Sequence, residues 1–239
     1  MGPTVERPLG KKWQEYFCQG TFFGEILARF KFKTISLAKS QLRSRLLKKQ
    51  RRIRCGATSD FAGFSRAFVN AVYERLGLKE RKRIFVYLDG PHELSVAPFI
   101  GALLNYGHCI YVPCWSNSKP DELLRYTPLL SIEDISSFRK VSGIPMPSIE
   151  GQEVEIPLPD AIFIPAVAYD YKGNRLGRGT GHFDRYLCSL RTRNPPISPL
   201  LIGVIPTEYY LFDELIPAEP HDIPIGYLLT GHEELIKIE

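Results

Sequence analysis

The 239-residue sequence lacks long hydrophobic runs and has few cysteines. No apolar stretch approaches the roughly 18 residues of a membrane span. The apolar residues of 16–32 are interrupted by Gln, Gly, Glu and Arg, which argues against a secretory signal. The five cysteines are odd in number and include no C-x-x-C pair, so a zinc site or a disulfide framework is not expected. These absences favour a cytoplasmic protein that does not bind membranes.

The excess of positive charge is also small. The 31 basic and 26 acidic residues give a net charge of +5, too little to indicate nucleic-acid binding without a concentrated basic patch. One such patch exists at 39–54, where every charged residue is Lys or Arg. Leu42, Leu46 and Ile53 recur near one face of this segment, which predicts an amphipathic helix with a basic outer side.

That basic helix has three possible roles: a solvated surface, contact with RNA or membrane, and binding of a small anion. Nucleic-acid binding would favour aromatic platforms among the basic residues, and 39–54 contains no aromatic residue. Lys39 and Arg43, one helical turn apart, can reach one phosphate together. We therefore expect no nucleic-acid partner.

Alternating strand-like and helix-like segments predict an α/β fold. Apolar runs indicate strands at 84–88, 109–112, 161–164, 201–205 and 227–229, and helical patterns occur at 96–105 and 183–191. Such strands predict a mostly parallel sheet with helices on both faces, a Rossmann-like three-layer sandwich with ligands at the carboxyl ends of its strands. Residues 34–239 are expected to form one domain, preceded by an extension of uncertain order at 1–33. Residues 116–159 are predicted to be extended loops with an edge hairpin.

The most informative segment is G-N-R-L-G-R-G-T-G-H-F-D-R-Y-L at 173–187. Its alternating glycines, Gly177, Gly179 and Gly181, allow backbone N–H groups to approach an anion, and Arg175 and Arg178 add positive charge. A helix starting near residue 183 would direct its positive dipole end to the same point. The segment has no Gly-Lys-Ser/Thr ending and fits the G-x-G-x-x-G dinucleotide pattern poorly, so it indicates a triphosphate cradle of another kind.

The same segment resembles the signature of the 5-formyltetrahydrofolate cyclo-ligase family, also called 5,10-methenyltetrahydrofolate synthetases. Three further segments resemble that family, in its order: K-S-Q-L-R at 39–43, G-I-P-M-P at 143–147 and E-P-H-D at 219–222. The resemblance implies an ATP- and Mg²⁺-dependent closure of 5-formyltetrahydrofolate to 5,10-methenyltetrahydrofolate, with release of ADP and phosphate. It implies a reduced folate as the partner, and we expect a monomer.

Site residues are carried over from the family position by position. For ATP the resemblance implies Lys39, Arg43, Arg175, Leu176, Gly177, Arg178, Gly179, Thr180, Gly181, His182 and Phe183. For folate it implies Leu88, Glu93, Arg178 and His182, and for Mg²⁺ it implies Asp184 and Asp222.

The chain also departs from the family. It has His182 and Phe183 where the family has two tyrosines, and Pro206 and Tyr209 where an aromatic residue and Gln are usual. A related enzyme with the same nucleotide site and another formylated or pterin-like substrate is therefore the alternative. A nucleic-acid-associated module that uses 39–54 is a third, less favoured reading.

Overall fold

The computed structural model describes residues 22–54, 63–114, 124–148, 157–219 and 221–239. The helices are α2 (Phe22–Arg54), α3 (Arg66–Arg75), α4 (Ala97–Asn105) and α5 (His182–Arg191), with short 3-10 helices η1 (Glu133–Ser137) and η2 (Thr207–Tyr209). None of the described helices combines the length and apolar character that crossing a bilayer requires.

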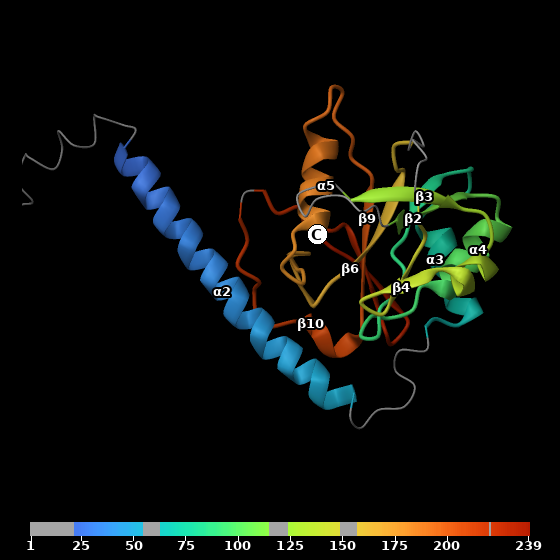
Figure 1. Ribbon diagram of the computed structural model, residues 1–239, viewed down its shortest axis with the longest axis horizontal. Coiled ribbons are helices and arrows are strands. Elements are labelled where there is room, and N and C mark those ends of the chain that lie inside the picture. Colours follow the sequence, from blue (N-terminus) through green and yellow to red (C-terminus); the bar gives the residue numbers. More distant parts are fainter. Residues whose placement is uncertain (1–21, 55–62, 115–123, 149–156, 220) are drawn as a thin grey trace, which may run out of the picture.

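A seven-stranded sheet forms the centre of the fold (Figure 1). Its order is β12 (Glu234–Lys237), β11 (Tyr227–Thr230), β9 (Leu200–Ile205), β6 (Ala161–Pro165), β1 (Arg83–Phe85), β2 (Cys109–Cys114) and β3 (Arg125–Leu129). The five central strands pair in parallel, whereas β3 and β12 pair antiparallel at the two edges. The predicted parallel strands are all present, although β1 is shorter than expected and the strand β12 was not predicted.

Helices cover both faces of this sheet, which confirms the predicted three-layer α/β sandwich. Successive residues of β1 point to opposite faces, as the two-residue period of a strand requires. Ile84 packs in one core with Val72 of α3 and Phe99 of α4, and Phe85 packs in a second core with Leu187 of α5. The strands are buried on both sides, which explains their continuous apolar character.

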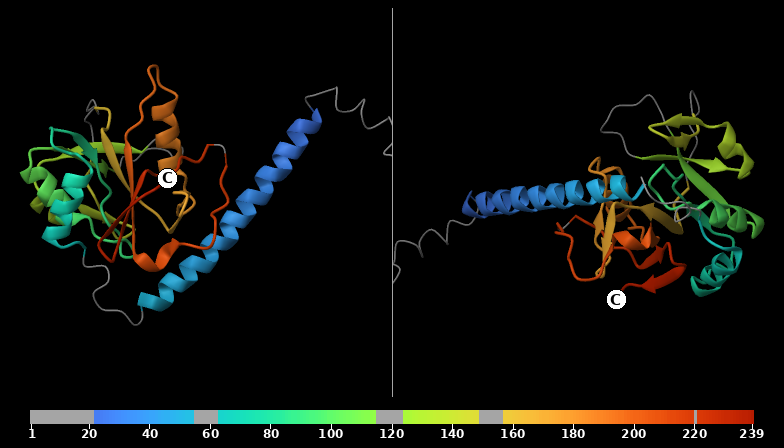
Figure 2. Two further views of the ribbon diagram at one scale, coloured as in Figure 1. Left: turned by 180° about the vertical axis from the view of Figure 1, so that it is seen from behind. Right: turned by 90° about the horizontal axis from the view of Figure 1, so that it is seen from below.

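Helix α2 packs on a second, three-stranded sheet with the order β10 (Tyr210–Leu211), β7 (Ala168–Asp170) and β8 (Arg175–Leu176). Leu42 and Leu46 bury the expected apolar face against residues of this sheet, including Ala168 and Leu176. The helix is longer than predicted, and the expected boundary between residues 33 and 34 falls inside it. Its first half projects beyond the globular body (Figures 1 and 2).

The segment 116–159 contains more structure than predicted. It contributes the edge strand β3, followed by η1 and an antiparallel hairpin of β4 (Arg139–Val141) and β5 (Ile144–Met146). The hairpin agrees with the expected edge element. Residues 115–123 and 149–156 lie outside the described residues.

Candidate active site

A cavity of about 180 Å³ lies at the carboxyl ends of the central strands. Tyr87 and Leu88 follow β1, Pro113 is the last but one residue of β2, Pro165 ends β6 and Ala166 follows it; all of them line the cavity. Counted along the chain, the parallel strands have the spatial order second, first, third, fourth, fifth, so the connections reverse direction between β1 and β6. Such a reversal point is where open α/β sheets bind ligands.

The glycine-rich segment forms one wall of this cavity. Gly179 and Gly181 have φ angles of +104° and +67°, a backbone conformation that side chains with a Cβ rarely adopt, and α5 begins directly afterwards at His182. Arg43 Nε donates to the Gly177 carbonyl oxygen over 2.7 Å, and Arg185 Nη1 donates to the Thr180 carbonyl oxygen over 2.9 Å. Two cations therefore hold the segment through its carbonyl groups, one from α2 and one from α5.

Arg175 is buried at the base of this wall, with 5% of its side chain exposed. Its Nη2 forms an ion pair with Asp184, and its guanidinium lies 5.8 Å from the centre of the Phe183 ring. Its Nη1 atom is buried and has no hydrogen-bond partner in the described part of the chain. A buried N–H group without an acceptor is costly, so this atom favours an oxygen-bearing ligand in the cavity.

A second charged cluster joins α2 to the segment before β11. Lys39 Nζ lies 2.8 Å from Glu219 Oε2 and 2.5 Å from Asp222 Oδ2, with 12% of the Lys39 side chain exposed. Burial lowers the pKa of Lys39, while the hydrogen bonds and charges of Asp222 and Glu219 raise it by more, so that it lies above its usual value. This lysine is therefore protonated at neutral pH and neutralises part of the carboxylate charge.

The same carboxylates are the best candidates for a metal ion. Among the described residues, ligand atoms of Glu219, His221 and Asp222 lie within 4.8 Å of one another. Glu219 Oε1 is buried and, within the described residues, accepts no hydrogen bond, so a ligand position is available. The group contains the predicted ligand Asp222 but not Asp184, which is paired with Arg175.

Two of the residues predicted for folate, Leu88 and Glu93, line the cavity from the segment between β1 and α4, and the other two, Arg178 and His182, line it from the glycine-rich segment and the start of α5. Leu88 is buried, and Glu93 accepts hydrogen bonds from Gly90 N over 2.9 Å and from Arg178 Nε over 3.3 Å. His182 lines the cavity, and its Nδ1 lies 3.1 Å from Arg185 Nη2. Burial, and then the charge of Arg185, lowers the pKa of His182, which keeps its ring neutral at pH 7.

Most of the predicted site residues meet in this one cavity. Those lining it are Leu88, Glu93, Arg175, Gly177, Arg178, Thr180, Gly181, His182, Phe183 and Asp184. Arg43, Leu176 and Gly179 lie beside it or behind its wall, and Lys39 and Asp222 form the separate charged cluster. Glu219, His221 and Arg185 were not among the predicted site residues, although the first two stand in the E-P-H-D segment that carried part of the resemblance.

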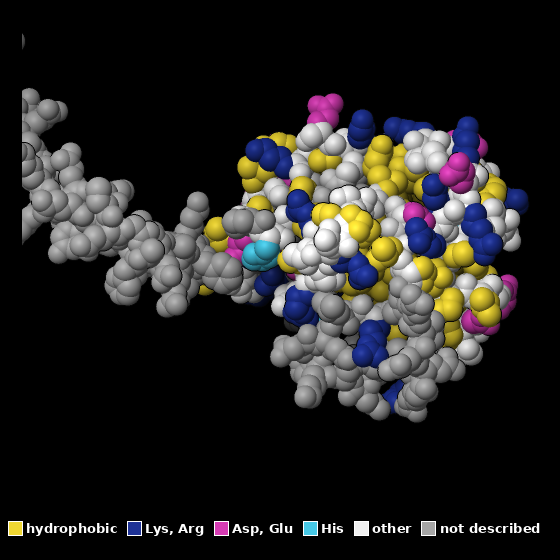
Figure 3. Space-filling view, turned by 90° about the horizontal axis from the view of Figure 1, so that it is seen from above, with side chains coloured by type: hydrophobic (Ala, Val, Ile, Leu, Met, Phe, Trp, Pro, Cys, Tyr) yellow, Lys and Arg dark blue, Asp and Glu magenta, His cyan; other side chains and the backbone are white. Residues whose placement is uncertain are grey.

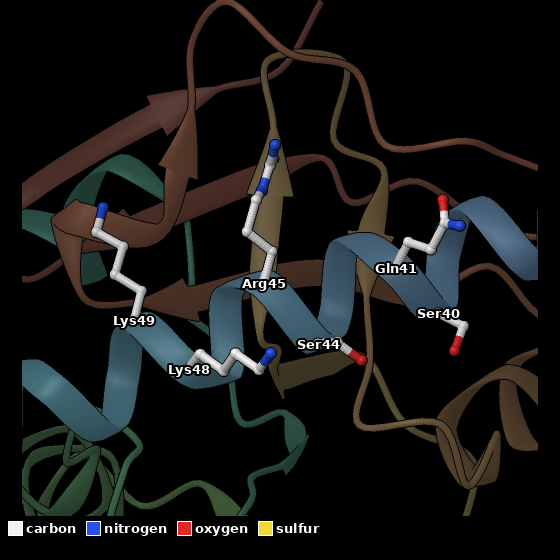
Figure 4. Close-up of a pocket in the computed structure, with 6 residues that line it drawn as sticks. All are labelled: Ser40, Gln41, Ser44, Arg45, Lys48 and Lys49. Atoms are coloured by element: carbon white, nitrogen blue, oxygen red, sulfur yellow. The ribbon is translucent and has the colours of Figure 1, made fainter.

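The outer side of α2 differs from its inner side. Arg43 contacts Gly177, and Lys39 contacts Glu219 and Asp222. A shallow hollow on the helix is lined by Ser40, Gln41, Ser44, Arg45, Lys48 and Lys49 (Figure 4). One helix supplies all of these lining residues, and two of them also contact the segment around β10: Arg45 pairs with Glu214, and Lys49 donates to the Glu208 carbonyl oxygen. Lys and Arg side chains are dispersed among hydrophobic ones over the described part of the face in Figure 3.

A doubly wound sheet with an arginine- and glycine-lined cavity at its reversal point is typical of α/β enzymes that bind anionic ligands. Comparison with known proteins gives the family. The sequence pattern of the 5-formyltetrahydrofolate cyclo-ligase family matches residues 35–231, and the chain belongs to this family of enzymes.

Named relatives agree with this assignment. The chain is 27% identical over 202 residues to the 5-formyltetrahydrofolate cyclo-ligase of Mus musculus, covering 82% of this chain and 95% of the relative. It is 31% identical over 157 residues to that of Haemophilus influenzae, covering 64% of this chain and 78% of the relative. Among solved structures, the 5,10-methenyltetrahydrofolate synthetase of Aquifex aeolicus superposes with a TM-score of 0.57 at 25% identity, over 84% of this chain and 93% of that one.

Proposed function

We propose that the chain catalyses the ATP-dependent conversion of 5-formyltetrahydrofolate to 5,10-methenyltetrahydrofolate, with release of ADP and phosphate. One observation carries the proposal beyond family membership: the glycine–arginine segment and the residues expected to hold the pterin, Leu88 and Glu93, line the same cavity. Nucleotide and folate can therefore meet there.

The chemical difficulty is the formyl group. Its carbon is a poor electrophile, and its oxygen leaves only after it has become part of a phosphate ester. Transfer of the terminal phosphoryl group of ATP to the formyl oxygen makes that ester and releases ADP. The second folate nitrogen then attacks the formyl carbon, loses its proton, and the C–O bond breaks as phosphate departs. Such phosphoryl transfer is catalysed mainly by positioning and charge neutralisation.

The residues around the cavity can supply both. Arg175 and Arg178 offer guanidinium groups, and the start of α5 at His182 offers its positive dipole end to the phosphates. Arg43 contacts Gly177 from α2, and Lys39 lies one helical turn before it on the same helix. ATP would accordingly be held by residues 175–183 together with Lys39 and Arg43.

The carboxylates fit the requirements of Mg²⁺. Magnesium takes few protein carboxylates, keeps phosphate oxygens or water in its shell, and neutralises phosphate charge during transfer. Asp222, with Glu219 beside it, would hold the ion near Lys39, and Asp184 would contribute from the first turn of α5. In the structure Asp222 is paired with Lys39, and Asp184 is paired with Arg175. Metal binding by these aspartates would therefore require Lys39 and Arg175 to turn from the carboxylates to the phosphates of the nucleotide.

The pterin end would lie against Leu88, with Glu93 accepting hydrogen bonds from ring N–H groups. Arg178 contacts Glu93 and also belongs to the wall formed by the glycine-rich segment, where the phosphates would bind (the phosphate wall). It would therefore lie between the two ligands. His182 and Phe183 replace two tyrosines of the family pattern. They motivate the second candidate, the same reaction type on another formylated or pterin-like substrate.

The remaining assignments are also proposals. We propose a cytoplasmic monomer without a nucleic-acid partner. The five cysteines are odd in number and their spacing does not indicate a disulfide framework, which supports a reducing compartment. The described part of the basic helix divides between the site and an exposed hollow.

ATP consumption separates the two substrate candidates. The full chain is incubated with ATP, Mg²⁺ and 5-formyltetrahydrofolate or other formylated pterins, and ADP is measured against the folate consumed. One ADP per 5-formyltetrahydrofolate supports the proposal. ADP release only with another formylated compound would transfer the assignment to the second candidate.

A further inference from the structure

Asp170 is a fully buried carboxylate outside the residues so far assigned to the site. It ends β7 and has no measurable exposure. Its Oδ1 accepts hydrogen bonds from the backbone N–H groups of Lys172 and Asn174. Its Oδ2 accepts hydrogen bonds from Asn174 Nδ2 and from the backbone N–H of Ile216. All four donor–acceptor distances are 2.9 Å. Four N–H donors thus converge on one carboxylate.

One of its partners, Asn174, directly precedes Arg175 of the phosphate wall. Asn174 donates to Asp170 with its backbone and its side chain, and the next residue is Arg175. Arg175 pairs with Tyr169 across the hairpin of β7 and β8, and its guanidinium lines the cavity. Asp170 consequently fixes the backbone from which Arg175 enters the site.

The other partner leads to the proposed metal ligands. Ile216 precedes Glu219 by three residues, and Glu219 and Asp222 contact Lys39. Ile216 is buried with Leu42 and Leu46 of α2, the helix that carries Lys39 and Arg43. The Asp170 carboxylate therefore connects the phosphate wall to the segment Glu219–Asp222 (the acidic segment). Ile216, which it holds, also packs against α2.

We infer that Asp170 is a positioning residue for nucleotide and metal binding, which sets the spacing between Arg175 and the Glu219–Asp222 segment. The inference rests on the proposed function. Catalytic groups must be held closely for phosphoryl transfer, and a buried residue that orients them affects ligand binding without touching the ligand.

The substitution Asp170→Asn tests this at one atom. An amide has a single acceptor oxygen, which can keep the Lys172 and Asn174 backbone contacts, but its NH₂ group would then face the N–H groups of Asn174 Nδ2 and Ile216. The link to the acidic segment is lost while side-chain volume is kept. Asn174→Ala is the milder variant, since it removes only the Nδ2 contact. Asp213→Asn is the matched control, because Asp213 is exposed in the same segment as Ile216.

Steady-state kinetics of the full chain are measured well below each variant's unfolding temperature. We expect Asp170→Asn to raise the KM for ATP and the Mg²⁺ concentration for half-maximal rate about tenfold, and Asn174→Ala to raise them about threefold. The KM for the folate stays within about twofold, and Asp213→Asn matches the wild type. A purely structural Asp170 predicts a lower unfolding temperature and a lower maximal rate with both KM values unchanged, which would overturn the inference.

The two variants keep the inference testable if Asp170→Asn does not fold, because an unchanged KM for ATP in a folded Asn174→Ala would then refute it. ATP affinity is also measured by calorimetry, so that the proposed reaction and the inference can fail separately. A wild-type chain that binds ATP but forms no methenyl product contradicts the reaction, and the comparison of variant ATP affinities still decides the role of Asp170. A wild-type chain that does not bind ATP overturns both.

Discussion

Lys39→Met is the substitution whose effect follows most directly from the structure. It keeps the length and apolar stem of the side chain but removes the ammonium from between Glu219 and Asp222. Removing one partner of a buried ion pair costs about 3–5 kcal/mol, because the other charge stays buried. The three side chains are 12%, 7% and 16% exposed, so water screens the remaining charges only in part. We expect a loss of about 2–4 kcal/mol in the free energy of unfolding at pH 7.

In a chain of this size, 1 kcal/mol corresponds to roughly 2–4 °C, so the melting temperature should fall by about 4–16 °C. The pKa of Lys39 is raised above its usual value of 10.5, so its contribution is fully present below that pH and disappears as pH rises through the folded-state pKa. The difference in the free energy of unfolding between Lys39→Met and wild type should therefore be constant around neutrality and should narrow in strong alkali.

Thermal unfolding with and without Mg²⁺ is the assay, and the control is Lys48→Met on the exposed side of the same helix. If Glu219 and Asp222 bind the metal, Mg²⁺ should stabilise Lys39→Met more than wild type, since the competing ammonium is gone. A melting temperature within about 1 °C of wild type at pH 7 would refute the reasoning on the ion pairs.

Three further substitutions separate the parts of the site. Arg178→Ala removes a charge-assisted phosphate contact of about 1.5–3 kcal/mol, so calorimetry should show ATP affinity about 10- to 150-fold weaker, and an unchanged affinity contradicts the cradle. Glu93→Gln should raise the KM for the folate and spare ATP binding, whereas equal loss of both ligands would indicate misfolding. Asp184→Asn should raise the Mg²⁺ requirement because Asn lacks the charge, and it should also lower the melting temperature because the buried Arg175 loses its charged partner. A normal Mg²⁺ titration would remove Asp184 from the metal site.

Local patterns in the sequence predicted the parts of this molecule that depend on nearby residues. The alternating glycines and the start of α5 were predictable because backbone conformation and helix polarity are local properties. Leu42 and Leu46 predicted the buried face of α2 through their spacing. The central strands were recognisable as apolar runs because both of their faces are buried.

The rest depends on contacts between distant segments. Lys39 meets Glu219 across 180 positions in the sequence, and no local pattern announces such an ion pair. In the sequence Asp170 resembles any turn-forming aspartate, because its hydrogen bond from the Ile216 backbone N–H joins residues that are 46 positions apart. The edge strand β12, E-L-I-K, was missed because it is short and partly exposed. Its pairing with β11 decides its structure more than its own composition does.

Formation of the methenyl product is the most direct test of the account. The wild-type chain is mixed with 5-formyltetrahydrofolate, ATP and Mg²⁺, and the near-ultraviolet absorbance band of 5,10-methenyltetrahydrofolate is followed against reactions that lack protein, ATP or Mg²⁺. We predict product only in the complete mixture. Absorbance that rises no faster than in the protein-free control would contradict the proposed reaction.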